Sequence, residues 1–133
     1  MAFGERIAIS LKPGSVVALY GGLGAGKTCL AKGIARGLGI TEHITSPTYT
    51  IVCEYSVCLD GRAIPLYHID AYRLNGNEDF ESTGAGEFIG NEGITIIEWS
   101  ERIPLSIPGD AITVEIEITG LQSRTFRVRG LDG

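Results

Sequence analysis

The sequence predicts an α/β fold, and the first observation that predicts it is a strand pattern followed by a glycine cluster and a helix pattern. The apolar run "SVVALY" at 15–20 is typical of a short buried strand. Beyond the glycines, apolar residues recur at helical spacing from Leu30 to Leu38, and glycines at 37 and 39 end the pattern as helix C-terminal glycines do. The glycine cluster therefore joins a strand to a helix.

The second observation is a series of strand patterns in the rest of the chain. Residues 50–69 are expected to form two antiparallel strands, because their apolar segments flank Asp60-Gly61, a common two-residue hairpin turn. A weakly amphipathic short helix is expected around 77–89. The run "ITIIE" at 94–98 suits one buried strand. The segments "AITVEIEI" and "TFRVR" predict a half-exposed C-terminal antiparallel hairpin.

Composition limits the organisation and the class of the protein. A chain of 133 residues, 44% of them hydrophobic, can bury one core but hardly two, so a single domain over 1–133 is expected. The net charge of −5 argues against a broad nucleic-acid-binding face. The cysteines, at 29, 53 and 58, form no C-x-x-C pair and are interpreted as reduced core thiols, which favours a cytoplasmic protein. No apolar run has the length of a signal peptide or a membrane span.

The glycine cluster matches the phosphate-binding pattern G-x-x-x-x-G-K-S/T in the strand, loop and helix order that this pattern requires. Without Cβ atoms, the loop can turn its N–H groups toward phosphate oxygens, and the helix start adds about half a positive charge. Lys27 is expected to reach the β- and γ-phosphates, and Thr28 to offer its hydroxyl to Mg²⁺. The expected nucleotide-binding residues here are Gly21, Gly22, Leu23, Gly24, Ala25, Gly26, Lys27, Thr28 and Cys29.

Two carboxylates follow apolar strands, where a magnesium shell needs an acidic group. Glu98 ends "ITIIE" and must reach a metal through one more methylene than the usual aspartate; the alternative is a strand cap at the surface. Asp70 follows the strand in "LYHIDAYR" and is a candidate to hold the metal's water shell or to orient the attacking water. Its alternative is a carboxylate paired with Arg73 or accepting helix N–H groups.

Three further side chains are candidates for the same pocket. His68 lies two positions from Asp70, so both point to one strand face, and His68 is interpreted as a hydrogen-bonding pocket or core residue rather than a zinc ligand. Trp99 is a candidate to stack on a base or a partner, although a lone tryptophan is more often core or interface. Thr48, in the segment "ITSPTYTIVCEY", is a candidate γ-phosphate sensor; the alternative is a polar turn at Pro47.

Several of these motifs occur together in one known family. The segments "GGLGAGKTCLAKG", "SPTYTIVCEY", "LYHIDAYRL" and "IIEWSERIP" stand in the family's order and at about its intervals. The chain thus resembles the bacterial TsaE (formerly YjeE) family, the small P-loop ATPase of tRNA threonylcarbamoyladenosine biosynthesis. The resemblance covers the chain from about Phe3 to the terminal hairpin.

The resemblance implies a P-loop NTPase-like three-layer fold with a mixed central sheet, and a cytoplasmic ATPase that uses ATP and Mg²⁺. Such proteins bind the complex of the threonylcarbamoyl transferase subunit and its inactive paralogue, and ATP hydrolysis keeps that complex turning over. They meet tRNA only indirectly, through that complex. The alternatives left open are a small-molecule kinase, which would need a lid and a substrate pocket, and a non-catalytic nucleotide-dependent adaptor.

The resemblance also implies roles for individual residues. Lys27 and Thr28 match the phosphate-loop lysine and the metal-binding threonine, Glu98 matches the metal-binding glutamate, and Asp70 matches the aspartate needed for activity. Thr48 and Trp99 match the switch-like segment and the tryptophan after the glutamate, so Trp99 joins the expected nucleotide-binding residues.

The chain departs from the family pattern in the glycine-rich loop and in the residues expected to contact adenine. Gly22 stands where the family commonly has aspartate, which removes a charge beside the phosphates. The family usually carries about fifteen more N-terminal residues, including a threonine near the adenine, so adenine contact is expected to be weaker or made differently, with help from the turn at 120–123. Only Arg73 and Arg102 are near candidates for an arginine finger, so slow, partner-stimulated turnover is expected.

Overall fold

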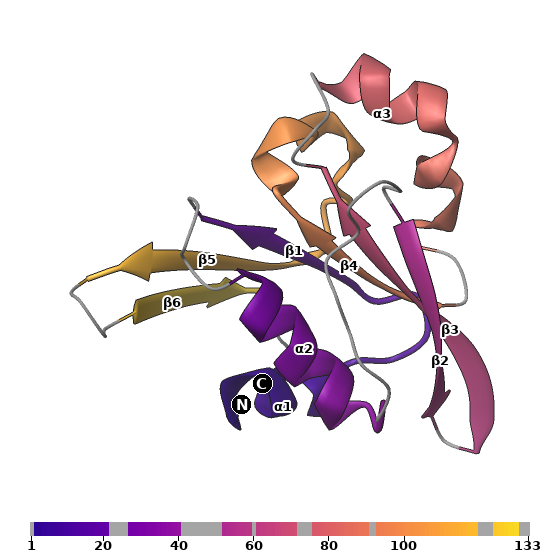
Figure 1. Cartoon of the computed structure of the whole chain (residues 1–133), viewed down its shortest axis with the longest axis vertical. Coiled ribbons are helices and arrows are strands. Elements are labelled where there is room, and N and C mark those ends of the chain that lie inside the picture. Colours follow the sequence, from indigo (N-terminus) through magenta and orange to yellow (C-terminus); the bar gives the residue numbers. More distant parts are fainter. Residues whose placement is uncertain are drawn as a thin grey trace.

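A computed structural model of the chain describes residues 2–21, 27–40, 52–59, 61–71, 76–90, 93–119 and 124–130. Within these residues one six-stranded sheet runs in the order β2-β3-β4-β1-β5-β6 (Figure 1). The strands are β1 (Val16–Tyr20), β2 (Val52–Leu59), β3 (Arg62–Asp70), β4 (Ile94–Glu98), β5 (Ile112–Ile118) and β6 (Arg124–Arg129). The strand predictions at 15–20 and 94–98 are confirmed to within one residue.

The sheet is mixed. Strands β3, β4, β1 and β5 are parallel to one another, whereas the outer strands β2 and β6 run antiparallel to β3 and β5. Because parallel strands share a direction, the carboxyl ends of β1, β3 and β4 meet at one edge of the sheet. The predicted α/β fold with a mixed sheet and a C-terminal antiparallel hairpin is confirmed.

Helices cover both faces of the sheet. Helices α1 (Ala2–Ile9) and α2 (Lys27–Gly37) lie side by side on one face, where their apolar residues pack with Val17 and Ile96 (Figure 1). Helix α3 (Asn77–Thr83) packs on the other face, where Phe80 contacts the cluster around Ile97. Three short 3-10 segments follow, at Ala85–Phe88, Ser100–Arg102 and Pro104–Ser106. No described helix is both long and apolar enough to cross a membrane.

Two parts of this fold differ from the sequence predictions. The helix expected around 77–89 is broken at Gly84, whose φ of 77° ends α3 before the 3-10 turn begins. The cysteines are not core thiols: Cys29 and Cys58 are exposed and Cys53 is half-buried. Cys58 faces outward because it alternates with the buried Val57 along the outer strand β2.

Helix α1 was not expected from the sequence, and two glycines explain how closely it packs on α2. A Cβ atom at Gly4 would lie 2.6 Å from the carbonyl carbon of Gly33, and one at Gly37 would lie 2.6 Å from the Ala8 Cβ. Neither distance is tolerable for a real methyl group, so only glycine allows this separation of the two helices. The glycine at position 4 also lowers the helix signal of an eight-residue segment.

We expect Gly4→Ala to lower the free energy of unfolding by about 2 kcal/mol, because the added methyl group forces α1 away from the α2 backbone. Chemical denaturation followed by circular dichroism measures this change. Gly109→Ala is the matched control, because no atom lies within 4 Å of its Cβ position, and it should change stability by less than about 0.5 kcal/mol. Equal stability of the two variants would show that the helices separate without penalty.

Candidate active site

The predicted site residues gather at the edge where β1, β3 and β4 end. Asp70 and Glu98 are the last residues of β3 and β4, and they are register partners across the parallel pair. Both alternate with residues that pack toward α3, namely Ile69 and Ile97, so both side chains belong to the face covered by α2. Helix α2 begins at Lys27. The carboxylates and the start of α2 therefore meet at one corner of the sheet.

Lys27 is only 5% exposed and contacts two of the described residues at this corner. Its Nζ donates a hydrogen bond to the carbonyl oxygen of Gly21, and the same atom lies 3.0 Å from the centroid of the Trp99 ring. A cation over an indole face is an attractive arrangement that strengthens when water is excluded. The lysine predicted to reach phosphates thus lies folded onto the start of its own loop and onto Trp99.

Burial lowers the pKa of the Lys27 ammonium from its ordinary value of 10.5, and the nearby Arg102 acts in the same direction. The carboxylates of Glu101, Glu98 and Asp70 oppose that shift. The three acidic groups therefore help to keep a buried cation charged at the place where phosphate charge is expected.

Trp99 adopts an unusual backbone conformation. Its φ is 61°, and among the described residues it is the only non-glycine residue with a positive φ. This left-handed residue turns the chain from β4 into the 3-10 segment that holds Arg102, whose Cζ lies 5.8 Å from the Trp99 ring centroid. Residues other than glycine are strained in the left-handed backbone region, and such residues concentrate at functional sites. The contact of Trp99 with Lys27 was not predicted from the sequence.

Glu98 is buried, at 2% exposure, and its Oε2 lies 2.5 Å from Nε2 of His68. The alternative interpretation of Glu98 as a strand cap at the surface is therefore wrong. His68 is 1% exposed, in agreement with its interpretation as a hydrogen-bonding pocket residue. Its other ring nitrogen, Nδ1, is buried and has no hydrogen-bond partner in the described part of the chain.

Glu101 is a site residue that the sequence interpretation missed. Its Oε2 accepts a hydrogen bond of 3.2 Å from the backbone N–H of Gly21, the first residue of the predicted phosphate-binding loop. The available signal was its spacing of three residues from Glu98 in "IIEWSERIP", because a tight turn at that spacing returns a side chain to the same edge.

Several predicted residues cannot be assigned a place in this geometry. Residues 22–26 of the loop, Thr48, Arg73 and residues 120–123 lie outside the described residues, as does the side chain of Thr28. Thr28 itself belongs to the first turn of α2, and Cys29 follows it with an exposed side chain. Their predicted roles stay predictions.

The donor set at the corner fits magnesium. Mg²⁺ is usually held by one or two carboxylates together with substrate phosphates and water, rather than by a cage of protein ligands. Glu98 and Asp70 supply two carboxylates on one face, and no group of three histidine, cysteine or acidic side chains suited to a metal occurs among the described residues.

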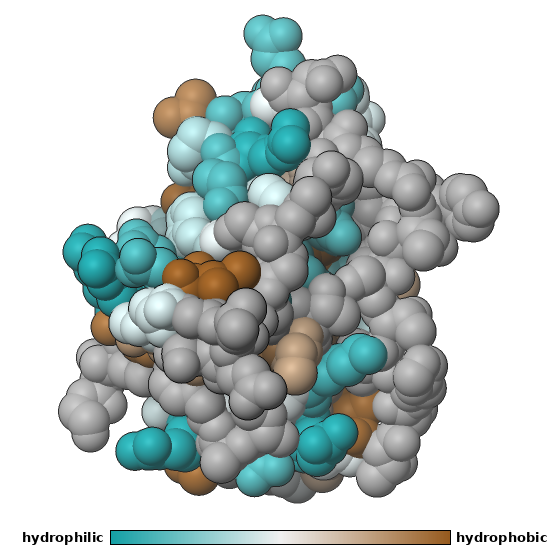
Figure 2. All heavy atoms as spheres, turned by 60° about the vertical axis from the view of Figure 1, so that its left-hand side comes forward, coloured by the Kyte–Doolittle hydropathy of each residue, from teal (hydrophilic) through white to brown (hydrophobic). Residues whose placement is uncertain are grey.

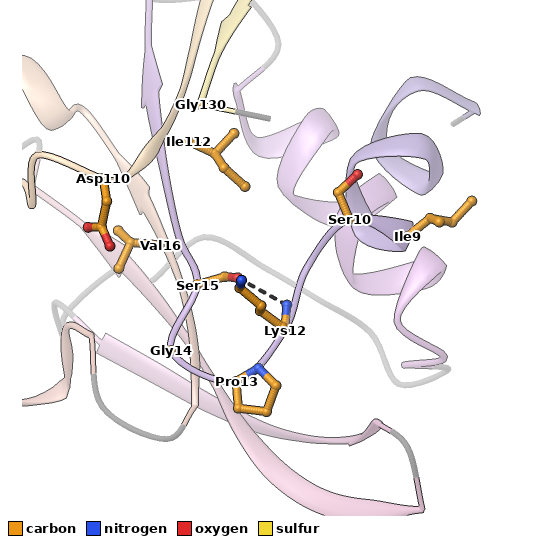
Figure 3. Close-up of a pocket in the computed structure, with 10 residues that line it drawn as sticks. All are labelled: Ile9, Ser10, Lys12, Pro13, Gly14, Ser15, Val16, Asp110, Ile112 and Gly130. Atoms are coloured by element: carbon orange, nitrogen blue, oxygen red, sulfur yellow. Dashed lines mark hydrogen bonds between the residues drawn. The ribbon is translucent and has the colours of Figure 1, made fainter. Parts of the chain in front are cut away.

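Two hollows lie near the central strands. One, of about 280 Å³, opens beside Gly21 and is lined by Glu115, Arg127 and neighbouring residues, at the same edge as the corner. A larger one, of about 710 Å³, lies between Ser10, Asp110 and the turn at 12–15, where the Lys12 N–H donates a 3.0 Å hydrogen bond to Ser15 Oγ (Figure 3). It lies where β1 and β5 begin, away from every predicted site residue that is described.

Known proteins are similar to this chain over most of its length. The family model described as "Threonylcarbamoyl adenosine biosynthesis protein TsaE" matches residues 1–126. This chain belongs to the TsaE family. The TsaE protein of Treponema pallidum (strain Nichols) is 43% identical over 126 residues, which cover 95% of this chain and 90% of that protein. The TsaE protein of Bacillus subtilis (strain 168) is 40% identical over 131 residues, covering 97% and 79%.

The fold of this TsaE family member is also similar to a solved structure. The match is "Crystal structure of Bacillus subtilus YdiB", with a TM-score of 0.72 and 36% sequence identity. It covers 94% of this chain and 74% of that chain. The family is therefore supported by sequence and by structure.

Trp99 is the only tryptophan in the chain, so its fluorescence reports directly on the Lys27 contact. We expect Lys27→Ala to increase quenching of that fluorescence by acrylamide, because truncation uncovers the ring face under the ammonium. Lys12→Ala is the matched control, since Lys12 is exposed in the turn at the opposite edge and should leave quenching unchanged. Equal quenching by acrylamide of the wild type, Lys27→Ala and Lys12→Ala would contradict the contact between Lys27 and Trp99.

Proposed function

We propose that this protein is a Mg²⁺-dependent ATPase that supports tRNA threonylcarbamoyladenosine biosynthesis in the cytoplasm. One observation supports it above all: Lys27, at the start of α2, lies near enough to two carboxylates at the ends of parallel strands for their charges to raise its pKa against the effect of burial. A cation at a helix start binds phosphate, while a carboxylate opposite suits the metal that accompanies it. The names of the relatives supply the biosynthetic role.

Lys27 would exchange its present contacts for phosphate oxygens. Its Nζ leaves the Gly21 carbonyl and the Trp99 ring and donates to the β- and γ-phosphates, while the loop amides and the α2 dipole bind the same oxygens. Glu98 and the Thr28 hydroxyl would hold Mg²⁺. The bound ion supplies positive charge that offsets the charge developing on the phosphates.

Asp70 is the proposed water-orienting residue. It ends β3 beside Glu98, on the face that Lys27 shares. Its carboxylate accepts a hydrogen bond from a water whose oxygen attacks the γ-phosphorus, and the bond from that phosphorus to the bridging oxygen of ADP breaks. The water's proton passes to Asp70 or to the released phosphate, and the products are ADP and inorganic phosphate. Asp70 therefore acts on the rate rather than on nucleotide affinity.

The proposed partners are the threonylcarbamoyl transferase subunit and its inactive paralogue. Arg102 is a described arginine at the corner, with its Cζ 5.8 Å from the Trp99 ring centroid and an exposed side chain. Docking of a partner over this exposed edge would order such a side chain and raise turnover. We therefore expect slow turnover by the protein alone and faster turnover in the complex.

We expect Asp70→Asn to lower ATP turnover about 10²- to 10⁴-fold, because the amide cannot accept the water's proton. Turnover is measured with and without the transferase pair, and Mg-ADP affinity, measured by calorimetry, should stay near that of the wild type. Asp110→Asn is the matched control, an exposed aspartate at the opposite edge. Wild-type turnover by Asp70→Asn would contradict the role of Asp70.

Two outcomes would contradict the proposed function itself. One is the absence of any Mg-nucleotide association by folded wild-type protein at millimolar ligand. The other is transfer of the γ-phosphate to a metabolite rather than to water, which would indicate a kinase.

A further inference from the structure

We infer that His68 is a positioning residue for Glu98, holding its carboxylate so that it meets the metal in one orientation. The inference rests on the proposed function and deepens it. It starts from the 2.5 Å contact between His68 Nε2 and Glu98 Oε2, which joins two side chains that are 2% and 3% exposed. No motif argument from the sequence assigned that contact to either residue.

The sheet register produces the contact. His68 pairs with Ile96 and Asp70 pairs with Glu98, so His68 and Glu98 stand two positions apart on the same face of neighbouring strands. At that diagonal spacing the long Glu98 side chain reaches back along the strand to the imidazole. Asp70, two positions beyond His68, is the register partner of Glu98.

The chemistry of the pair indicates which ring nitrogen of His68 carries the hydrogen. A carboxylate has only acceptors, so a short contact with Nε2 requires a hydrogen on Nε2. Nδ1 is buried without a partner among the described residues, and a bare lone pair there is tolerated better than a buried N–H with nothing to donate to. The imidazole therefore donates from Nε2 and leaves Glu98 its negative charge.

A fixed orientation matters for the Glu98 carboxylate because glutamate is longer than the aspartate that is usual at such a strand end. Where a strand-end aspartate has two side-chain torsions, Glu98 has three, and each free torsion spreads the positions of its oxygens. A donor fixed at Oε2 removes that freedom and leaves Oε1 as the oxygen expected to face the metal. Such outer contacts to metal ligands commonly change metal affinity 10- to 100-fold.

The test compares two substitutions of similar size. His68→Leu removes the donor, and His68→Gln keeps an amide N–H that reaches Oε2. Calorimetry measures the dissociation constant of ADP in EDTA and in Mg²⁺, and the ratio gives the gain in affinity due to magnesium. We expect that gain to fall about 10-fold in His68→Leu and to be largely restored in His68→Gln, with the EDTA affinity unchanged in both.

A second measurement uses the wild type and does not depend on the leucine variant folding. The chain has only two histidines, so ¹⁵N-labelled histidine signals can be assigned with His68→Gln. We expect His68 to carry its hydrogen on Nε2. A hydrogen on Nδ1 instead, or a wild-type magnesium gain in folded His68→Leu, would overturn the inference. Failure of the wild type itself to gain affinity with Mg²⁺ would overturn the proposed function instead.

Discussion

The parallel pairing of β3 with β4 is the constraint on which the rest of the site depends. It aligns Asp70 with Glu98 and brings His68 within reach of the same carboxylate. A slip of one residue in β4 would turn Glu98 toward α3 and into an apolar cluster that offers it no described partner. The strand is held against this slip because both of its faces are buried, with Ile96 packed under α2 and Ile97 under α3.

The corner balances charges that would be unfavourable separately. A buried ammonium needs anionic neighbours, and Glu98 and Glu101 supply them together with Asp70. Lys27 also contacts the Trp99 ring, an uncharged group that attracts a cation less strongly than a carboxylate does. On the face of the molecule in Figure 2, apolar atoms outside the grey residues lie in small separate groups.

Sequence patterns predicted the features that depend on residues close together in the chain. The strand at 94–98 and the placement of Glu98 and Asp70 at strand ends follow from apolar runs and their boundaries. The contact of Lys27 with Trp99 was not predictable from the sequence. It depends on the left-handed backbone conformation of Trp99, which a bulky residue rarely adopts. Helix α1 was missed because its stability comes from packing against α2 rather than from its own sequence.

The two glycine contacts between α1 and α2 also restrict how the corner can respond to a ligand. Gly4 abuts the α2 backbone at Gly33, and Gly37 abuts Ala8, so α2 is wedged against its neighbour along its last two turns. If α2 slid along its axis, atoms of α1 and α2 would clash at these two glycines, so the position of α2 is fixed. Any adjustment at this corner must then come from the torsions of side chains such as Lys27, while the helix axis keeps its position.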